Sequence, residues 1–314
     1  MHYLILRYII LKKGGRMVYQ HTSVDYIYLK LRFAGYTTAQ IYRILDYAPD
    51  FVTYDADAQY EVLTKLATSF RIKMDDELRA RYRALKIDDL LSYLKRCETQ
   101  FITIHHPHYP SLLTQIYDPP LVLFYRGKLQ LLNHTKTLAI VGSRHATRYT
   151  YDALNAFFPS FKASNLTIVS GLAKGADHFA HQLALAYHLP TIAVLGFGHM
   201  CHYPHMTKET RHLIEREGLV ISEYLPETPP RKFHFPQRNR LISGLSRGVL
   251  VTEARKNSGT HITTQYAVDQ NREVYILPGT IFDPMTEGNL LSAQQGAKIV
   301  SNVEDIIEDF QYVE

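Results

Sequence analysis

The segment RKFHFPQRNRLISGLS, residues 231–246, combines cationic and aromatic side chains at close spacing. Its cations are Arg231, Lys232, Arg238 and Arg240, which are interleaved with Phe233 and Phe235. Such cations hold the phosphates of a single-stranded nucleic acid while a ring stacks on an exposed base, a contact worth roughly 1–3 kcal/mol. A solvated surface segment is the alternative. The two arginines of RNR would not share one face of a helix, so one of them could instead bind an acidic group within the protein.

The loop VGSRHAT, residues 141–147, is suited to binding a phosphate. Gly142 lets the backbone turn sharply, Ser143 and the following amides are donors, and Arg144 adds a charge shaped for phosphate. The loop has neither the glycine spacing of GxGxxG nor the GxxxxGK[ST] pattern, so we expect no nucleotide cofactor. A plain strand-to-helix turn with a surface arginine is the alternative.

Two further loops offer similar chemistry. In SGLAKGADHFAH, residues 170–181, Ser170, Gly171 and the amides of the coming helix form a second anion-binding position. Lys174 or the glycine after it would face the same cleft, although small residues packed under a sheet explain the pattern equally. A third position is expected where TEARKNSGTHITTQYA, residues 252–267, begins a helix at its Gly-Thr pair. A row of such sites suits a polymer better than one mononucleotide.

Short apolar runs alternating with amphipathic helical segments position these loops. This pattern predicts an α/β domain with a doubly wound, mainly parallel sheet covered on both faces. The predicted strands are residues 137–141, 166–170, 191–195, 219–222, 248–252 and 273–277. Ligands of such sheets bind outside the carboxyl ends of the strands, so the three loops share the functional edge.

A small helical domain is predicted over residues 17–98. One helix ends at Gly35, and the next is capped by Thr37 or Thr38 and stopped by Pro49. The chain up to residue 98 has 16 basic and 12 acidic residues, which accounts for most of the net charge of +5. Its basic faces could bind nucleic acid or a protein, or could simply be solvated.

The domain boundaries follow from shifts in composition. Residues 99–314 form the second domain, and its proline-rich beginning, with the short strands FITI and LVLFY, is an irregular extension. The codons of a purine-rich ribosome-binding site read as Lys-Gly-Gly, and KKGGR precedes Met17. We therefore expect translation to begin at Met17 and residues 1–16 to be an upstream extension. A native amino-terminal strand or peripheral helix is the alternative.

The composition excludes several classes of protein. With 314 residues, 46% apolar and 21% charged, the chain is long and apolar enough to fold without disulfide bonds or structural metal ions. Cys97 and Cys201 form no CxxC pair, which fits a reducing cytoplasm. No apolar run is long enough to span a membrane, and the first residues lack the order of a secretory signal.

Enzymatic and metal sites have little support in the sequence. The histidines 199, 202 and 205 are spaced by three, but Pro204 interrupts any helix there and no carboxylate accompanies them, so we expect no metal. The HxE…PCxxC pattern of deaminases and the GxSxG elbow of hydrolases are both absent.

Several motifs in order resemble the DNA-processing protein A family (DprA, also called Smf). They are DPPLVLFYRG, AIVGSR, VSGLAKGAD, TIAVLGFG with YP, ISEY, FPQRNRLISGLS, LVTEA with SGTHIT, and LPG with GNLL, over residues 101–300. The resemblance implies an extended Rossmann-like domain, preceded by a small all-α domain like the sterile alpha motif (SAM-like). It also implies a cytoplasmic, non-enzymatic homodimer that binds and protects single-stranded DNA and loads RecA recombinase in natural transformation.

The same resemblance suggests residue roles. Arg144 of the GSR motif would hold a phosphate, Lys232 would bind DNA, and Phe235 would stack against a base. The backbone at Ser170 and Gly171 would complete the phosphate site. The two arginines of the FPxRNR motif would either contact DNA or be structural.

Some features depart from the family pattern. Many members have Arg or Leu at the position of Lys174, and here Met206 and Thr207 replace the polar end of the YPxxN motif. Some members carry a carboxyl-terminal winged-helix-like domain, which we do not expect here, because the sequence reaches Glu314 soon after the last predicted helix. A nucleoside-phosphate hydrolase of the lysine-decarboxylase-like type and a protein adaptor that does not touch DNA are the alternative functions.

Overall fold

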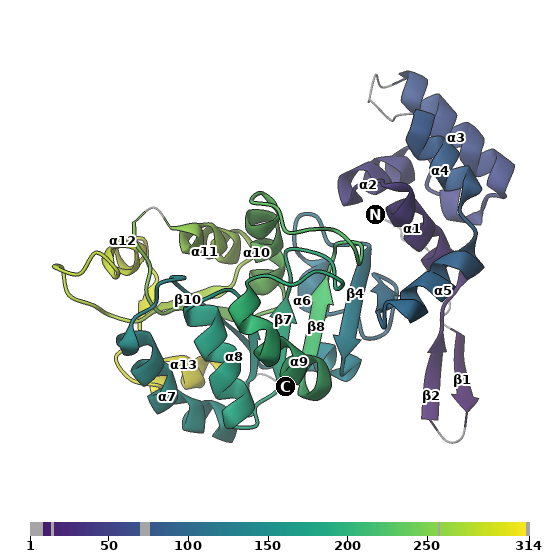
Figure 1. Cartoon of the computed structure of the whole chain (residues 1–314). Coiled ribbons are helices and arrows are strands. Elements are labelled where there is room, and N and C mark those ends of the chain that lie inside the picture. The colour runs from purple at the N-terminus through teal and green to yellow at the C-terminus, as the bar shows by residue number, and fades with distance from the viewer. Residues whose placement is uncertain (1–8, 14–15, 70–75, 257, 312–314) are drawn as a thin grey trace. The chain divides into compact units, whose positions relative to one another are not determined.

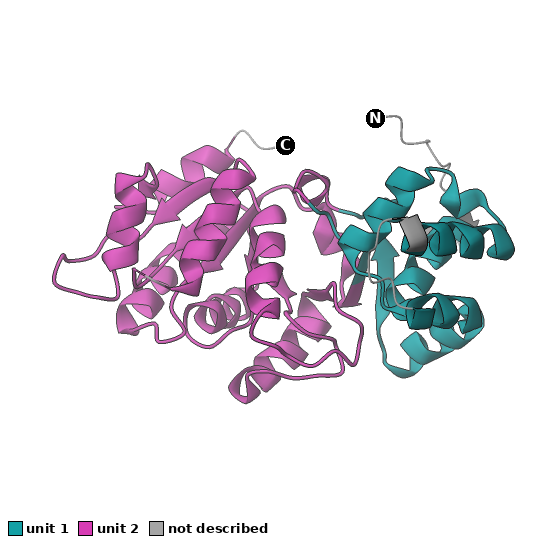
Figure 2. Ribbon diagram, turned by 90° about the horizontal axis from the view of Figure 1, so that it is seen from above, with its two compact units in different colours: residues 1–109, 118–123 teal, residues 110–117, 124–314 magenta. Residues whose placement is uncertain are grey.

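The computed structural model describes residues 9–13, 16–69, 76–256 and 258–311 (Figure 1). The chain forms two compact units, each described here by itself (Figure 2). The first contains residues 1–109 and 118–123, and the second contains residues 110–117 and 124–314.

The first unit is mainly helical. Its helices are α1 (Ser23–Ala34), α2 (Thr38–Tyr47), α3 (Ala56–Ser69), α4 (Asp76–Ala84) and α5 (Ile87–Arg96). The predicted signals operate as expected at two helix ends. Gly35 ends α1 with a φ of 106°, and the Thr37 side chain caps α2 by accepting a hydrogen bond from the Gln40 backbone N–H.

Three strands in this unit add to the predicted helices. An antiparallel hairpin joins β1 (Ile9–Lys13) to β2 (Arg16–Gln20), so one hairpin spans both sides of the predicted start at Met17. That start site stays a prediction, as does the SAM-like assignment. The strand β3 (Gln100–Thr103) belongs to the same unit.

The compact units divide the chain later than the predicted boundary at residue 98. The Thr103 hydroxyl donates a hydrogen bond to the buried Asp25 carboxylate of α1. The Tyr42 hydroxyl donates to the Pro119 carbonyl at 3.0 Å. These bonds tie the proline-rich segment to the helices.

The second unit contains the predicted sheet. Its strands are β4 (Val122–Gly127), β5 (Thr137–Val141), β6 (Thr167–Ser170), β7 (Thr191–Val194), β8 (Leu219–Ser222), β9 (Gly248–Val251), β10 (Glu273–Ile276) and β11 (Lys298–Ile299). They pair in the order β11-β10-β9-β5-β6-β7-β8-β4, and β3 is the ninth strand of the sheet, next to β4. From β11 to β8 all neighbours are parallel, and β4 runs antiparallel to β8. The predicted α/β, Rossmann-like fold is therefore confirmed.

Helices connect these strands and cover the sheet (Figure 1). They are α6 (Ser111–Thr114), α7 (Arg148–Ala163), α8 (Ala176–Ala186), α9 (Lys208–Glu217), α10 (His234–Gly244), α11 (Gly259–Asp269), α12 (Glu287–Gln294) and α13 (Glu304–Ile307). Within the described ranges, no helix combines the length and apolar character needed to cross a bilayer.

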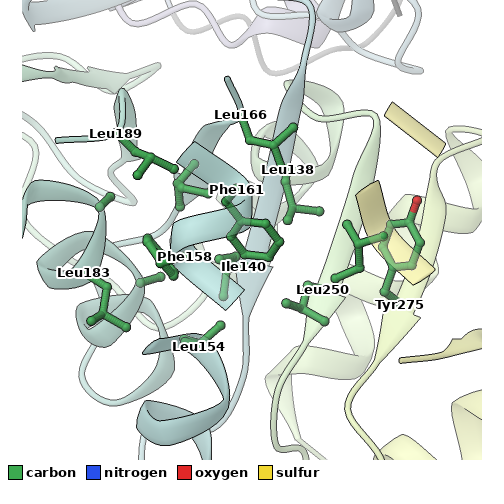
Figure 3. Close-up of a cluster of buried hydrophobic side chains, with 14 of the residues drawn as sticks. Leu138, Ile140, Leu154, Phe158, Phe161, Leu166, Leu183, Leu189, Leu250 and Tyr275 are labelled. Atoms are coloured by element: carbon green, nitrogen blue, oxygen red, sulfur yellow. The ribbon is translucent and has the colours of Figure 1, made fainter. Parts of the chain in front are cut away.

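A buried cluster fixes α7 and α8 against the sheet (Figure 3). Its members include Leu138 and Ile140 of β5, Leu154, Phe158 and Phe161 of α7, Leu183 of α8, Leu250 of β9 and Tyr275 of β10. Burying each large apolar side chain contributes roughly 1.5–3 kcal/mol, so the sheet is a rigid support for the loops at its edge.

The strand order creates a switch point at β5. The chain builds β5, β6, β7 and β8 outward on one side, then returns to place β9 on the other side of β5. The loops leaving β5 and β9 therefore diverge, and a crevice opens between them at the carboxyl ends of the strands.

Candidate nucleic-acid interface

A cleft of about 900 Å³ lies at this switch point. Five segments line it: the loop after β5, the loop after β6 with the beginning of α8, the segment after β7, the start of α10 with the residues just before it, and the loop leading into α11. The lining residues include Gly142, Ser143, Arg144, His145, Asp177, Tyr203, Lys232, Phe235, Arg238, Asn239, Arg255, Ser258, Gly259 and Thr260. The prediction that all three loops share one edge is confirmed, including the Gly-Thr pair at the start of α11.

The loop after β5 is held tightly by its own backbone. The Ser143 N–H donates to the Glu253 carbonyl at 2.7 Å, and the Ser143 carbonyl accepts from the Ala176 N–H at 3.1 Å. A Cβ added at Gly142 would collide with Thr252 and Ala176, so only glycine fits there. The expectation that the Ser143 amide donates to a phosphate is wrong for this structure, because that donor is already used.

Glu253 fixes the other end of this loop and was not anticipated as a site residue. Its fully buried carboxylate accepts hydrogen bonds from the Thr147 N–H at 2.7 Å and hydroxyl at 2.9 Å, and from the Thr150 hydroxyl at 2.6 Å. A carboxylate at the amino-terminal end of α7 also complements the helix dipole. Glu253 thereby positions the backbone that carries Arg144.

Arg144 is the exposed cation at the centre of the site. Its guanidinium carbon lies 5.3 Å from the centroid of the Phe235 ring. Arg144 lines the cleft, and within the described ranges no carboxylate forms an ion pair with it. This arrangement matches the predicted phosphate-binding role of Arg144 in geometry, and the role itself stays a prediction.

The loop after β6 turns its polar groups inward. Ser170 is fully buried, and its hydroxyl donates to the Ile140 carbonyl at 2.7 Å. The Gly171 N–H donates to the Asp177 carboxylate at 3.1 Å. The expectation that Ser170 and Gly171 complete a phosphate site is therefore wrong for this structure. Lys174 of the same loop is exposed and does line a small neighbouring cavity.

Arg238 is buried beneath this loop. It is 3% exposed, and its guanidinium donates to the Gly171 carbonyl at 2.6 Å and to the Val194 carbonyl. Burial lowers the pKa of Arg238 to about 10, while the nearby Asp177 charge opposes that fall. Burial likewise raises the pKa of Asp177, against the opposing effect of Arg238. Arg238 thus links β7 to the loop after β6, and its predicted DNA contact is replaced by a structural role.

Arg240 does not line the cleft. Its guanidinium donates to the Glu223 carboxylate at 2.7 Å, and both side chains are buried. The alternative that one arginine of RNR binds an internal acidic group is confirmed, and the expectation of a DNA contact at Arg240 is wrong for this structure.

The remaining residues of the predicted segment do reach the cleft. Lys232 is exposed, and Phe235 is half-buried with its inner edge against a small apolar cluster. The Tyr203 ring lies 5.6 Å from the Phe235 ring, at an interplanar angle of 46°. Tyr203 was not anticipated as a site residue, although it belongs to the YP pair noted in the sequence.

Two carboxylates at the site are engaged in internal hydrogen bonds: Asp177, which lines the cleft, and Glu253, which supports the loop after β5. The cleft also presents exposed cations and the aromatic rings of Tyr203 and Phe235. Within the described ranges, no group of three or more His, Cys, Asp or Glu side chains could hold a metal ion.

The fold and the cleft define a Rossmann-like protein with an open basic and aromatic site at its switch point. Residues 100–311 match the model of a family described as DNA recombination-mediator protein A. The chain belongs to this family.

The relatives agree with this assignment. The chain is 37% identical over 290 residues to the DNA processing protein DprA of Streptococcus pneumoniae, covering 92% of this chain and 99% of that protein. It is 38% identical over 224 residues to DprA of Bacillus subtilis, covering 71% and 75% respectively.

Two solved structures are also similar. The X-ray structure of S. pneumoniae DprA matches with a TM-score of 0.81 at 35% identity, over 93% of this chain and 99% of that one. A Helicobacter pylori DprA structure, described for its single-stranded DNA binding mode, matches with a TM-score of 0.61 at 27% identity. It covers 68% of this chain and 96% of that one.

Proposed function

We propose that this protein binds single-stranded DNA in the cleft at the switch point. The observation that carries the proposal is the contact of Arg144 with Phe235 at the mouth of an open cleft. A cation beside a ring lets one site hold a phosphate and stack a base. The similarity to a protein described for its single-stranded DNA binding mode supports this assignment.

The arrangement of charges suits a chain of phosphates. Arg144, Lys232 and Arg255 come from three different segments around one cleft, and all three are exposed. Exposed cations release counterions from the nucleic acid when they bind, so affinity should fall steeply with salt. Duplex DNA should bind more weakly, because its bases are stacked within the helix and cannot reach Phe235.

Membership of the family supports a biological role for this binding. We infer that the protein protects incoming single-stranded DNA in the cytoplasm and loads RecA recombinase onto it during natural transformation, acting as a homodimer without enzymatic activity. Sedimentation velocity tests the dimer, and RecA-catalysed strand exchange on DNA coated with a single-strand-binding protein tests the loading step.

Fluorescence anisotropy of labelled oligo-dT at several salt concentrations tests the DNA-binding step. Arg144→Ala and Lys232→Ala should each weaken binding and reduce the slope of log affinity against log salt by about 0.7. Phe235→Ala should weaken binding with the slope unchanged, because stacking releases no counterion.

Arg216→Ala is the matched control. Arg216 is exposed near the end of α9, just before β8 begins, and therefore at the opposite edge of the sheet from the cleft. Its removal should leave both affinity and slope unchanged. Absence of salt-dependent oligo-dT binding by the folded wild type would refute the proposed function.

A further inference from the structure

The loop after β9 is joined on one side to the loop that carries Arg144. The Ser143 N–H donates to the Glu253 carbonyl at 2.7 Å, and the Thr147 N–H donates to the Glu253 carboxylate, also at 2.7 Å. Arg144 lies between these two donors in the chain, so its place depends on where the backbone at Glu253 lies. Arg255, two residues further along the loop after β9, is itself an exposed cation of the cleft.

The other side of this loop is held by α12. The carbonyls on either side of Glu253 in the chain are those of Thr252 and Ala254. The Asn289 side-chain amide donates to the Thr252 carbonyl at 2.9 Å, and the Gly288 N–H donates to the Ala254 carbonyl at 2.8 Å. Three consecutive carbonyls of the loop after β9 therefore join the loop after β5 to the start of α12.

Asn289 also fixes the end of the neighbouring strand. Its side chain is fully buried, and the amide nitrogen donates to the Leu277 carbonyl, just after β10, at 2.9 Å. An amide nitrogen has two N–H groups, so its two contacts at 2.9 Å use both of them. The Asn289 Oδ1 atom has no hydrogen-bond partner among the described residues, so donation is what this side chain contributes. Asn289 thus joins the ends of β9 and β10 where the chain leaves β9 for the cleft.

We infer that Asn289 is a positioning residue for DNA binding, which acts through the backbone of residues 252–254 on the two cations Arg144 and Arg255. The inference rests on the proposed function and adds to it a residue that does not line the cleft. Because Asn289 is fully buried, its effect reaches the DNA only through the cations that it positions.

The start of α12 also contacts Arg255 and its backbone closely. The Arg255 Nε donates to the sulfur of the buried Met285 at 3.3 Å. A Cβ added at Gly288 would lie 2.7 Å from the Ala254 carbonyl oxygen and 2.8 Å from that of Arg255. Such distances are shorter than van der Waals contact, so only glycine fits here. A displacement of the start of α12 is therefore passed on to Arg255.

The salt dependence of binding gives the size of the expected effect. A single phosphate contact contributes about 0.7 to the slope of log affinity against log salt, which is about a fivefold change in affinity for each tenfold change in salt. Misplacing Arg144 and Arg255 together should therefore lower the slope by about 1.4. The affinity at about 0.1 M salt should fall roughly 25-fold relative to the affinity at about 1 M.

The test measures oligo-dT anisotropy against salt with the full-length chain carrying Asn289→Asp. Aspartate has the size of asparagine, but its carboxylate cannot donate to the carbonyls and repels their oxygens. We expect the slope to fall by about 1.4. Adding Arg255→Ala to this variant should lower the slope no further. Adding Lys232→Ala should lower it by a further 0.7 or so, because Lys232 lies on a separate segment before α10.

A second variant acts on the same loop without adding a charge. Gly288→Ala places a methyl group against the Ala254 and Arg255 carbonyls and should also lower the slope. Lower pH then tests the missing donor. Burial among carbonyl oxygens favours protonation of the carboxylate in Asn289→Asp, which restores an O–H donor. The affinity of Asn289→Asp relative to wild type should therefore recover in part between about pH 8 and pH 5.5, and that of Gly288→Ala should not.

Tyr275→Phe is the matched control for a loss of stability. The buried Tyr275 hydroxyl on β10 donates to the Asp309 carboxylate at 2.8 Å, and Tyr275 does not line the cleft. Its removal should lower the melting temperature and leave the salt slope unchanged. A slope lowered equally by Tyr275→Phe would assign the effect to general destabilisation and overturn the inference.

The outcomes separate this inference from the proposed function. Folded Asn289→Asp and Gly288→Ala proteins that bind oligo-dT with the wild-type slope would overturn the positioning role and leave DNA binding in the cleft intact. If Asn289→Asp does not fold, the slope of Gly288→Ala decides. Absence of salt-dependent oligo-dT binding by the folded wild type would overturn both.

Discussion

Replacing Arg238 distinguishes a structural cation from a DNA-binding one. The Arg238 guanidinium donates to the carbonyls of Gly171 and Val194 from a position that is almost entirely buried. A hydrogen bond from a charged donor contributes about 1.5–3 kcal/mol, so two such bonds contribute about 3–6 kcal/mol. Arg238→Ala also leaves the buried Asp177 without its nearest countercharge, which adds to the cost.

The expected change in melting temperature follows from this free energy. A unit of about 200 residues loses roughly 2–4 °C for each kcal/mol, so even the lower figure of about 3 kcal/mol predicts a fall of roughly 6–12 °C. Arg238→Lys should recover only part of the loss, because a single ammonium cannot present the planar fork of a guanidinium to two carbonyls. Arg144→Ala, on an exposed side chain, should change stability by less than about 0.5 kcal/mol.

Two measurements on the same variants decide between the roles. Thermal unfolding followed by circular dichroism gives stability, and oligo-dT anisotropy against salt, at a temperature where all variants are folded, gives the number of phosphate contacts. We expect Arg238→Ala to melt early with an unchanged salt slope and Arg144→Ala to show the reverse. An Arg238→Ala protein that melts like the wild type but loses about 0.7 from its salt slope would refute the structural assignment.

Three further predictions follow from the structure. Gly142→Ala should destabilise the protein by about 1–3 kcal/mol in urea unfolding, because the added Cβ meets Thr252, and an unchanged midpoint would contradict this packing. Burial lowers the pKa of His181 and of His199 from 6.5 to about 3. Between these pH values the two histidines are protonated in the unfolded chain but neutral in the folded chain. The free energy of unfolding should therefore fall as pH drops from about 6.5 toward 3. The fall should reach at most about 1.4 kcal/mol per pH unit for each histidine, and His181→Gln should flatten it in urea titrations across pH. Finally, the buried Arg211 guanidinium donates to the His199 carbonyl at 2.6 Å and so fixes the segment that leads to Tyr203 of the cleft. Arg211→Ala should lower the melting temperature and weaken oligo-dT binding with the salt slope unchanged, whereas a reduced slope would show that Arg211 contacts phosphate.

Most strands of the sheet could be predicted from the sequence, because each depends on a short local pattern of residues. Runs such as TLAIV and GVLVT are short, apolar and flanked by turns, and each forms a strand within one residue of its predicted bounds. The two-residue strand β11 has no such run and was not predicted. The helix end at Gly35 and the helix cap at Thr37 could be predicted for the same reason, since a helix end depends on only a few neighbouring residues.

The sequence could not show in the same way which cations would be exposed and which would be buried. Lys232 and Arg238 lie six residues apart in one basic segment, yet one is exposed in the cleft and the other is buried under Gly171. The difference depends on which carbonyls of other strands and loops approach α10, and this is a property of the assembled sheet. Glu253 shows the same limit, because its partners Thr147 and Thr150 are more than 100 residues away.

The buried charges of the site fix the loops that carry its exposed cations. Arg238 and Asp177 hold the loop after β6 from opposite sides of Gly171, and Glu253 holds the loop after β5. Because internal bonds already satisfy these backbones, DNA binding need not order them. The entropic cost of binding then comes mainly from a few exposed side chains such as Arg144, which lose rotamer freedom. This loss of entropy is small compared with the entropy gained when counterions are released from the DNA. A site built in this way binds strands of many sequences, because its affinity comes mainly from contacts with phosphates.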